Sequence, residues 1–237
     1  MVQSKAKIFL ADERGVNETA WFRSFNTFNF GRYQNEHKTP FGNIYVVNDD
    51  TLDGNRSLKM MVEEESFVIL LPIIGAIEYC DDEGAKNLLA AGQVQVLSVV
   101  KGETIELQNP FKTELVNFLQ VWIRKNTPLP TPYSSISTYD VNEFMNCLLQ
   151  IFPSRIWETE FPFSVHIGKF SGRGGTTFSP AKKNSAVFVF VLEGAFEVEG
   201  RLLHNRDGLA LLDTEEIEVE ALSNDAILLV IESSLTS

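Results

Sequence analysis

The chain has 237 residues, 44% of them hydrophobic, and carries a formal net charge of −12. This composition is sufficient for a packed core and excludes global disorder. The negative charge repels nucleic-acid phosphates and anionic lipid, so we expect no direct nucleic-acid binding and no membrane binding.

Two further features bear on where the protein resides. The N-terminus lacks the apolar run of a signal peptide, and no segment is apolar for long enough to span a membrane. The two cysteines, Cys80 and Cys147, are far apart and form no CxxC motif. We therefore expect a cytoplasmic protein with two reduced thiols.

Short runs of β-branched and aromatic residues dominate the first half of the chain. Turn-forming Gly, Asn and Asp residues separate these runs, for example at 50–55 and 81–84. Short strands with a turn roughly every 8–12 residues are typical of a sandwich or barrel. The predicted strands contain residues 44–47, 67–71, 94–97 and 118–123.

A proline-rich segment separates two similar halves. Three prolines fall within residues 126–132, where they favour an extended connector. In each half a predicted strand leads to a glycine, Gly75 or Gly194, and then to another strand. We predict two duplicated barrels, with domains at residues 1–127 and 128–237. The predicted strands of the second half contain residues 165–170, 186–192, 195–198 and 226–231.

Residues 140–152 are compatible with both helix and strand. Asp140 and Glu143 have the spacing of a helix-capping pair. The apolar residues that follow recur at helical intervals. We predict a short helical piece that passes into a strand near residues 148–152.

Several segments of the first half resemble the pirin family. Residues 27–33 read TFNFGRY and residues 92–98 read GQVQVLS. Together with residues 41–50 and 118–123, they resemble the N-terminal half of the family in the same order. The second half resembles the family's C-terminal cupin in its pattern, best at 207–210. The resemblance implies an all-β fold of two cupin-type barrels, also described as double-stranded β-helices or jelly rolls.

The resemblance also implies a metal site whose ligands are substituted in this chain. In pirins, three histidines and one glutamate bind iron or a similar divalent metal inside the first barrel. Counting from Gly75, Ser98 and Gly102 assigns these positions to Met61, Glu63, Ile105 and Leu107. One thioether, one carboxylate and two hydrocarbons do not replace such a donor set. We therefore expect no metal and no other cofactor.

The four substituted positions are predicted to form a ligand pocket. Residues 61 and 63 are two apart on one strand, so they share a face. We expect Glu63 to point into the barrel beside Met61, across from Ile105 and Leu107. A simpler interpretation is that residues 63–65 form a solvated acidic strand end.

The resulting functional prediction is a metal-free protein of two cupin barrels. We expect it to bind a small molecule in the first barrel, or a protein partner, and we assign no catalytic residue. One alternative is a metal-independent isomerase or hydrolase with Glu63 as its acid or base. Another is a divergent quercetinase-like dioxygenase with a metal bound elsewhere. An open first barrel favours ligand binding or catalysis, and a filled one favours an interaction role.

Overall fold

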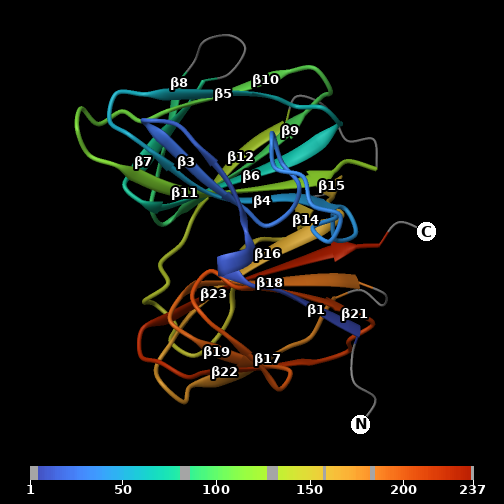
Figure 1. Ribbon diagram of the computed structural model, residues 1–237. Helices are drawn as coiled ribbons and strands as arrows, with labels where there is room; N and C mark the ends of the chain where they lie inside the picture. Colours follow the sequence, from blue (N-terminus) through green and yellow to red (C-terminus); the bar gives the residue numbers. More distant parts are fainter. Residues whose placement is uncertain (1–4, 81–85, 127–132, 157–158, 182–184, 236–237) are drawn as a thin grey trace. The chain divides into compact units, whose positions relative to one another are not determined.

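The computed structural model describes residues 5–80, 86–126, 133–156, 159–181 and 185–235 (Figure 1). Within these ranges the chain forms strands and one short 3-10 helix, Ala11–Glu13, so the predicted all-β class is confirmed. The described residues include no helix with the length and apolarity that a membrane span needs. The chain divides into two compact units, Gly15–Tyr139 and Met1–Arg14 with Asp140–Ser237.

The Gly15–Tyr139 unit contains two antiparallel sheets. A seven-stranded sheet has the order β12-β9-β6-β11-β4-β3-β2, and a four-stranded sheet has the order β5-β10-β7-β8. The strands are β2 (Gly15–Glu18), β3 (Phe22–Asn26), β4 (Ile44–Leu52), β5 (Ser57–Met61), β6 (Ser66–Ile74), β7 (Ala76–Cys80), β8 (Lys86–Ala90), β9 (Gln93–Val99), β10 (Thr104–Gln108), β11 (Val116–Arg124) and β12 (Tyr133–Thr138).

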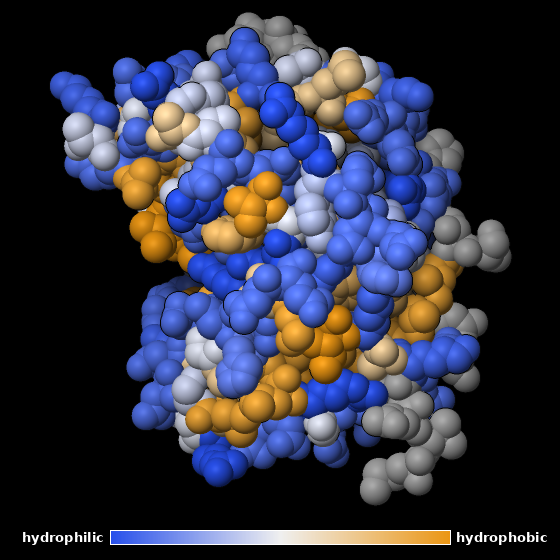
Figure 2. All heavy atoms as spheres, viewed as in Figure 1, coloured by the Kyte–Doolittle hydropathy of each residue, from blue (hydrophilic) through white to orange (hydrophobic). Residues whose placement is uncertain are grey.

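The two sheets of this unit share one apolar core. Alternation along each strand sends every second side chain inward, so Val46 of β4 and Phe118 of β11 join Ile105 of β10 in one buried cluster. Burying a side chain of this size is worth about 1.5–3 kcal/mol. On the face shown in Figure 2, hydrophilic residues predominate and hydrophobic residues form smaller patches between them.

The second unit repeats this plan with different strand lengths. Its six-stranded sheet has the order β1-β21-β18-β23-β16-β13, its four-stranded sheet has the order β17-β22-β19-β20, and β14 pairs with β15. The strands are β1 (Lys5–Phe9), β13 (Leu149–Phe152), β14 (Arg155–Ile156), β15 (Thr159–Glu160), β16 (Phe163–Phe170), β17 (Gly175–Phe178), β18 (Ser185–Glu193), β19 (Phe196–Val198), β20 (Arg201–Leu203), β21 (Gly208–Leu212), β22 (Ile217–Ala221) and β23 (Ala226–Ser234).

The same glycine hairpin occurs in both units. Gly75 joins β6 to β7 and Gly194 joins β18 to β19, and both have a φ of +80°. A Cβ atom at Gly75 would lie 2.9 Å from a methyl of Val116, and one at Gly194 would lie 2.4 Å from the Ser223 hydroxyl. Only glycine fits such a position without strain. The predicted strand–glycine–strand repeat is therefore confirmed.

The division between the units differs from the predicted one at residues 127/128. Strand β1 pairs along its whole length with β21, so the start of the chain belongs to the second unit. Strand β12 pairs with β9, so the first unit extends to Tyr139. The boundaries of the units depend on backbone pairing between distant segments, which local composition does not reveal. The proline-rich connector (127–132) and the turn at 81–84 lie outside the described residues.

The predicted helix at residues 140–148 is wrong. Asp140 accepts a hydrogen bond from the Asn142 backbone N–H (2.8 Å), which closes a local turn instead of capping a helix. Asn146 has a φ of 62°, a left-handed conformation that an α-helix does not contain. Phe144 is 53% exposed, so the apolar spacing does not face a core. The expected strand is present as β13.

Candidate functional site

A pocket of about 480 Å³ lies in the Gly15–Tyr139 unit. Residues of strands β4, β5 and β11 line it together with residues between 29 and 40. Its lining combines aromatic, thioether and polar side chains. The lining residues are Asn29, Phe30, Gly31, Gln34, Pro40, Tyr45, Val46, Met60, Met61, Glu63, Glu64, Trp122 and Arg124.

Three aromatic rings form one wall of this pocket. Phe30 meets Trp122 edge-on with ring centroids 5.7 Å apart, and Tyr45 meets it edge-on at 6.1 Å. Edge-to-face contacts of this kind hold the rings in fixed orientations. The three rings therefore give the pocket an apolar wall.

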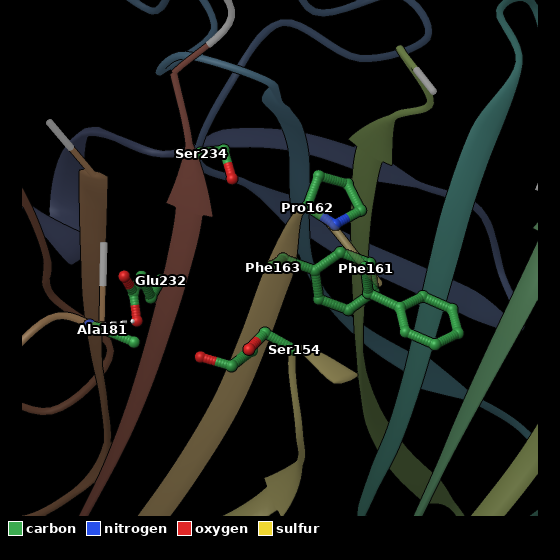
Figure 3. A pocket seen from close by; sticks show the side chains of 8 residues that line it. Ser154, Phe161, Pro162, Phe163, Ala181, Glu232 and Ser234 are labelled. Carbon is green, nitrogen blue, oxygen red and sulfur yellow. Dashed lines mark hydrogen bonds between the residues drawn. The ribbon is translucent and has the colours of Figure 1, made fainter. Parts of the chain in front are cut away.

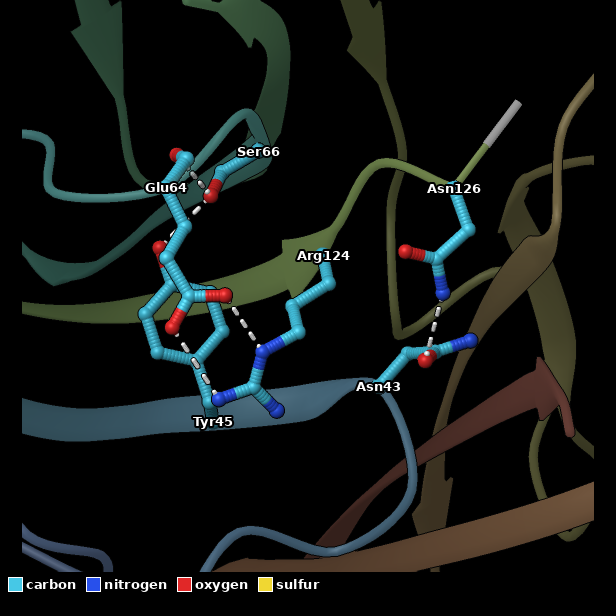
Figure 4. Close-up of polar contacts among 6 residues, drawn as sticks. All are labelled: Asn43, Tyr45, Glu64, Ser66, Arg124 and Asn126. Atoms are coloured by element: carbon cyan, nitrogen blue, oxygen red, sulfur yellow. Dashed lines mark hydrogen bonds and ion pairs between the residues drawn. The ribbon is translucent and has the colours of Figure 1, made fainter. Parts of the chain in front are cut away.

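The polar rim of the pocket is held by the hydrogen bonds in Figure 4. Arg124 donates to both carboxylate oxygens of Glu64, at 2.6 and 3.2 Å, and its guanidinium lies 4.9 Å from the Tyr45 ring centre. The Tyr45 hydroxyl lies 2.5 Å from the Ser66 hydroxyl, which donates to the Glu64 carbonyl at 2.8 Å. A bidentate pair beside an aromatic ring restricts the motion of Arg124.

The ionisation of the rim follows from these contacts. The hydrogen bond from Arg124 lowers the pKa of Glu64, so this carboxylate stays charged. Burial raises the pKa of Tyr45, so this phenol stays neutral. The rim thus combines the Glu64–Arg124 charge pair with a neutral Tyr45 hydroxyl, and Glu63 lies beside them at the pocket edge.

The structure separates the four positions that were expected to share a cavity. Met61 and Glu63 line the pocket with exposed side chains, and Met61 is 63% exposed. Ile105 and Leu107 are 1% and 0% exposed and belong to the apolar core.

The predicted inward direction of residues 61 and 63 is therefore not observed. Ile105 pairs with Met60, and the residues buried on this face are Met60 and Val62. Lys59, which has the parity of Met61, forms an exposed ion pair with Glu106 at 3.1 Å. The alternation of β5 thus directs residues 59 and 61 away from the core.

A polar layer under the pocket floor was not predicted. Asn48 and Asp50 of β4 and Gln120 of β11 are at most 1% exposed. In the ladder, Asn48 lies opposite Gln120, and the next pair toward the pocket is Val46 and Trp122. The three polar side chains therefore face the interior one step below the pocket.

The layer is joined to the pocket wall by hydrogen bonds through one amide. The Trp122 indole N–H donates to Gln120 Oε1 at 3.1 Å. Gln120 Nε2 donates to Asp50 Oδ2 and contacts the Met60 sulfur at 3.4 Å. Among the described residues, neither amide atom of Asn48 nor Oδ1 of Asp50 has a hydrogen-bond partner.

Asp50 is the buried titratable group of this layer. Burial raises its pKa to about 7, against the opposing hydrogen bonds from Ser24 and Gln120, and the neighbouring Asp49 carboxylate raises it further. A sequence signal for the layer exists: Gln120 has the parity of the apolar Phe118 and Trp122, so alternation places it inside.

The second unit has an open pocket of about 420 Å³ between Arg173 and Glu199 and, elsewhere, a much smaller cavity. A space of about 10 Å³, room for about one water, lies beside Phe163 and Glu232 (Figure 3). The Glu232 carboxylate accepts hydrogen bonds from the Ser185 hydroxyl at 2.6 Å and the Ala181 N–H at 3.1 Å. Nearby, His166 packs edge-on against Phe178, and burial lowers its pKa.

The available donor atoms do not fit the metal site of the family. Ile105 and Leu107 offer only hydrocarbon, and Met60, the inward neighbour of Met61, already contacts Gln120. Within the described ranges, no group of three or more His, Cys, Asp or Glu side chains is arranged to hold a metal ion.

The paired sheets and glycine hairpins define a protein of two cupin barrels. The chain belongs to the pirin family: the family model described as Pirin matches residues 10–123, and the model described as Quercetinase C-terminal cupin domain matches residues 163–232. Quercetin 2,3-dioxygenase of Escherichia coli K12 is 23% identical over 220 residues, covering 92% of this chain and 95% of that protein.

Solved structures support the same fold. The crystal structure of YhhW from Escherichia coli superposes with a TM-score of 0.85 at 21% identity, covering 98% of this chain and 99% of that one. Bacterial pirin YhhW in complex with nickel(II) gives a TM-score of 0.84 at 21% identity, with 98% and 100% covered. YhaK from Escherichia coli gives 0.72 at 16% identity, with 94% and 95% covered.

Proposed function

We propose that this pirin-family protein binds a small, flat, uncharged aromatic molecule in the pocket beside Trp122, without a metal ion. The observation that carries the proposal is the aromatic wall of Phe30, Tyr45 and Trp122 in a pocket of about 480 Å³. This volume lies within the range of about 300–1,000 Å³ typical of small-molecule sites. Arg124 is paired with Glu64, and the Glu63 carboxylate at the edge disfavours anionic ligands, so we expect a ligand without negative charge.

The lack of a metal in this proposal rests on donor chemistry. The positions that match the family's ligands supply two hydrocarbons, one thioether and one exposed carboxylate. Transition metals of the family's kind require imidazole or several anionic donors. We therefore assign no reaction step to a metal here.

An acid–base reaction at Glu63 has weaker support than binding. The Glu63 side chain is exposed at the pocket edge, where water competes for its carboxylate. A general base must lie within hydrogen-bond reach of a held substrate, and the ordered polar groups of the rim are Glu64, Arg124 and Tyr45.

A quercetinase-like dioxygenase remains the second candidate because relatives at 23% identity are named quercetin 2,3-dioxygenase. It requires a metal bound by other residues. Elemental analysis of the purified protein and a test for oxygen uptake with quercetin distinguish the two. One equivalent of iron, nickel or copper together with quercetin cleavage would favour the dioxygenase and refute our proposal.

Isothermal titration with quercetin and with unsubstituted flavone tests binding directly. Phe30→Ala should weaken binding at least tenfold, because it removes one ring of the wall. Phe22→Ala is the matched control: it is another partly buried phenylalanine against the same core, but it lines a different pocket. Equal losses in both variants, or no binding to the unmodified protein, would refute the assignment of this pocket.

A further inference from the structure

A continuous hydrogen-bond chain runs from a buried carboxylate to the wall of the proposed binding pocket. We infer that Asp50, acting through the amide of Gln120, positions the Trp122 indole and couples the pocket to the charge on Asp50. Asp50 is a positioning residue, since Gln120 stands between it and the pocket. The inference about Trp122 is independent of the ligand, and its consequence for affinity rests on the proposed function.

The indole of Trp122 determines which atom of the Gln120 amide faces which neighbour. An indole N–H can only donate, so Gln120 must turn its carbonyl oxygen toward Trp122, at 3.1 Å. The amide NH₂ then faces Asp50, whose carboxylate can accept its hydrogen bond. No other orientation of Gln120 satisfies both neighbours.

The same amide contacts two residues of the pocket. Gln120 Nε2 lies 3.4 Å from the Met60 sulfur, and both Met60 and Trp122 line the pocket. A change in the position or polarisation of Gln120 therefore reaches the floor and the wall together. The side chains are packed at 0–9% exposure, so small shifts are not absorbed by solvent.

The charge on Asp50 determines the strength of the two hydrogen bonds that link it to Trp122. A hydrogen bond to a carboxylate is stronger than one to a neutral carboxyl group. It also polarises the amide, so the carbonyl oxygen accepts more strongly from the indole. Protonation of Asp50 should thus weaken both hydrogen bonds and loosen Trp122.

The surroundings of Asp50 allow it to change charge near neutral pH. The groups that face it are Ser24 of β3, Gln120 and Phe118 of β11, and Asn48 two residues away on β4. The charge that acts on it is the Asp49 carboxylate, which accepts a hydrogen bond from Asn117 at 2.7 Å. Burial among these groups raises the pKa of Asp50 to about 7.

The indole N–H resonance of Trp122 in a ¹H–¹⁵N correlation spectrum tests the coupling without a ligand. Trp122→Phe assigns the resonance, and Trp21, which lies in the same unit, is the internal reference. As the pH rises from 5.5 to 8.5, the Trp122 resonance should move downfield with a midpoint near 7, while that of Trp21 stays constant.

Two variants decide whether Asp50 and Gln120 carry the effect. Asp50→Asn should abolish the titration, and Gln120→Met should abolish it while leaving Asp50 in place. An unchanged Trp21 resonance verifies that each variant is folded. A Trp122 resonance that does not titrate in the unmodified protein, or that titrates equally in Asp50→Asn, would overturn the inference.

The consequence for binding is measured with flavone, which has no ionisable group. Affinity should be several-fold higher at pH 8 than at pH 6 in the unmodified protein and equal at both values in Asp50→Asn. A titrating Trp122 resonance without flavone or quercetin binding would refute the proposed function and leave the positioning role intact. Binding that does not depend on pH, with a titrating resonance, would overturn the coupling to affinity.

Discussion

The two cupin units share a hairpin and differ in what they bury beneath it. Leu70 and Val189 each lie five residues before the hairpin glycine, and they pair with Gln120 and Val230, respectively. The next strands place Asn48 opposite Gln120 and His166 opposite Val230. The first interior thus has an amide where the second has a hydrocarbon.

This difference shows that the cupin fold does not require the buried polar residues of the first unit. In the second unit the equivalent position is the buried Val230, which shows that an apolar residue fits there, and His166 is the polar residue opposite it. A buried polar group without a partner costs about 1–3 kcal/mol, so the polar layer of the first unit lowers stability. The layer lies directly under the pocket, which is where a functional requirement would retain it.

Exchanging Gln120 and Val230, the equivalent residues of the two units, should give the largest changes in stability. Gln120→Val removes the partner of the Trp122 indole and one of the two side-chain partners of Asp50, and should lower the free energy of unfolding by about 4 kcal/mol at pH 8. At pH 5 the loss of free energy should be smaller, because losing one hydrogen bond costs a neutral Asp50 less than a charged one. Chemical denaturation at pH 8 and at pH 5 measures the loss in free energy of unfolding.

The reverse exchange is the matched control. Val230→Gln places an amide in the apolar interior of the second unit and should cost about 2–3 kcal/mol at either pH. A pH-independent loss for Gln120→Val would show that its effect comes from packing and not from Asp50.

Asp50 should make stability depend on pH. The folded state holds its proton up to about pH 7, whereas the unfolded chain releases it near 3.8. The unfolded state therefore binds fewer protons between these values, and the free energy of unfolding falls as the pH rises. The fall should reach roughly 4 kcal/mol, at about 1.4 kcal/mol per pKa unit, and it should be absent in Asp50→Asn. Parallel curves for the two proteins would contradict the raised pKa.

Two adjacent methionines test the register of β5. Met60 is 9% exposed and Met61 is 63% exposed. Met60→Ala should lower the free energy of unfolding by about 2–3 kcal/mol, and Met61→Ala should change it by less than about 0.5 kcal/mol. Thermal unfolding of the two variants side by side measures the difference. The opposite ranking would restore the inward direction predicted for residues 61 and 63.

Asn48→Leu should give a small effect of opposite sign to the losses above. Among the described residues, its buried amide has no hydrogen-bond partner, so a hydrocarbon of similar size removes a desolvation cost. We expect stabilisation by about 1 kcal/mol, measured by denaturant unfolding. Destabilisation would indicate that ordered water or a ligand group satisfies this amide in solution.

Much of the fold could be predicted from the sequence, because the signals are local. The strands around residues 44–47, 67–71 and 118–123 have the composition and turns of a barrel, and Gly75 and Gly194 mark equivalent hairpins. The helix at 140–148 failed for a local reason as well, since Asn146 adopts a conformation that interrupts it.

The candidate site was harder to predict because it depends on the directions in which side chains point from their strands. Counting back from Gly75 to Met61 and Glu63 crosses the irregular residues 62–65, where strand alternation stops. The count therefore identifies positions in the sequence but not the direction of their side chains: Met61 and Glu63 lie at the pocket with exposed side chains. Asp50 and Gln120 were missed because a polar residue in a strand is normally assigned to the solvent face.

The pairing of β1 with β21 has a consequence for how the chain folds. During synthesis, the Gly15–Tyr139 unit has all its strands once Tyr139 has emerged, so it can fold while the rest is being made. Strand β1 emerges first but must wait for Gly208–Leu212 before its backbone groups are paired. An N-terminal tag or short truncation should therefore disturb the unit that is synthesised last, and a nascent chain stalled before residue 208 should leave β1 open to proteolysis.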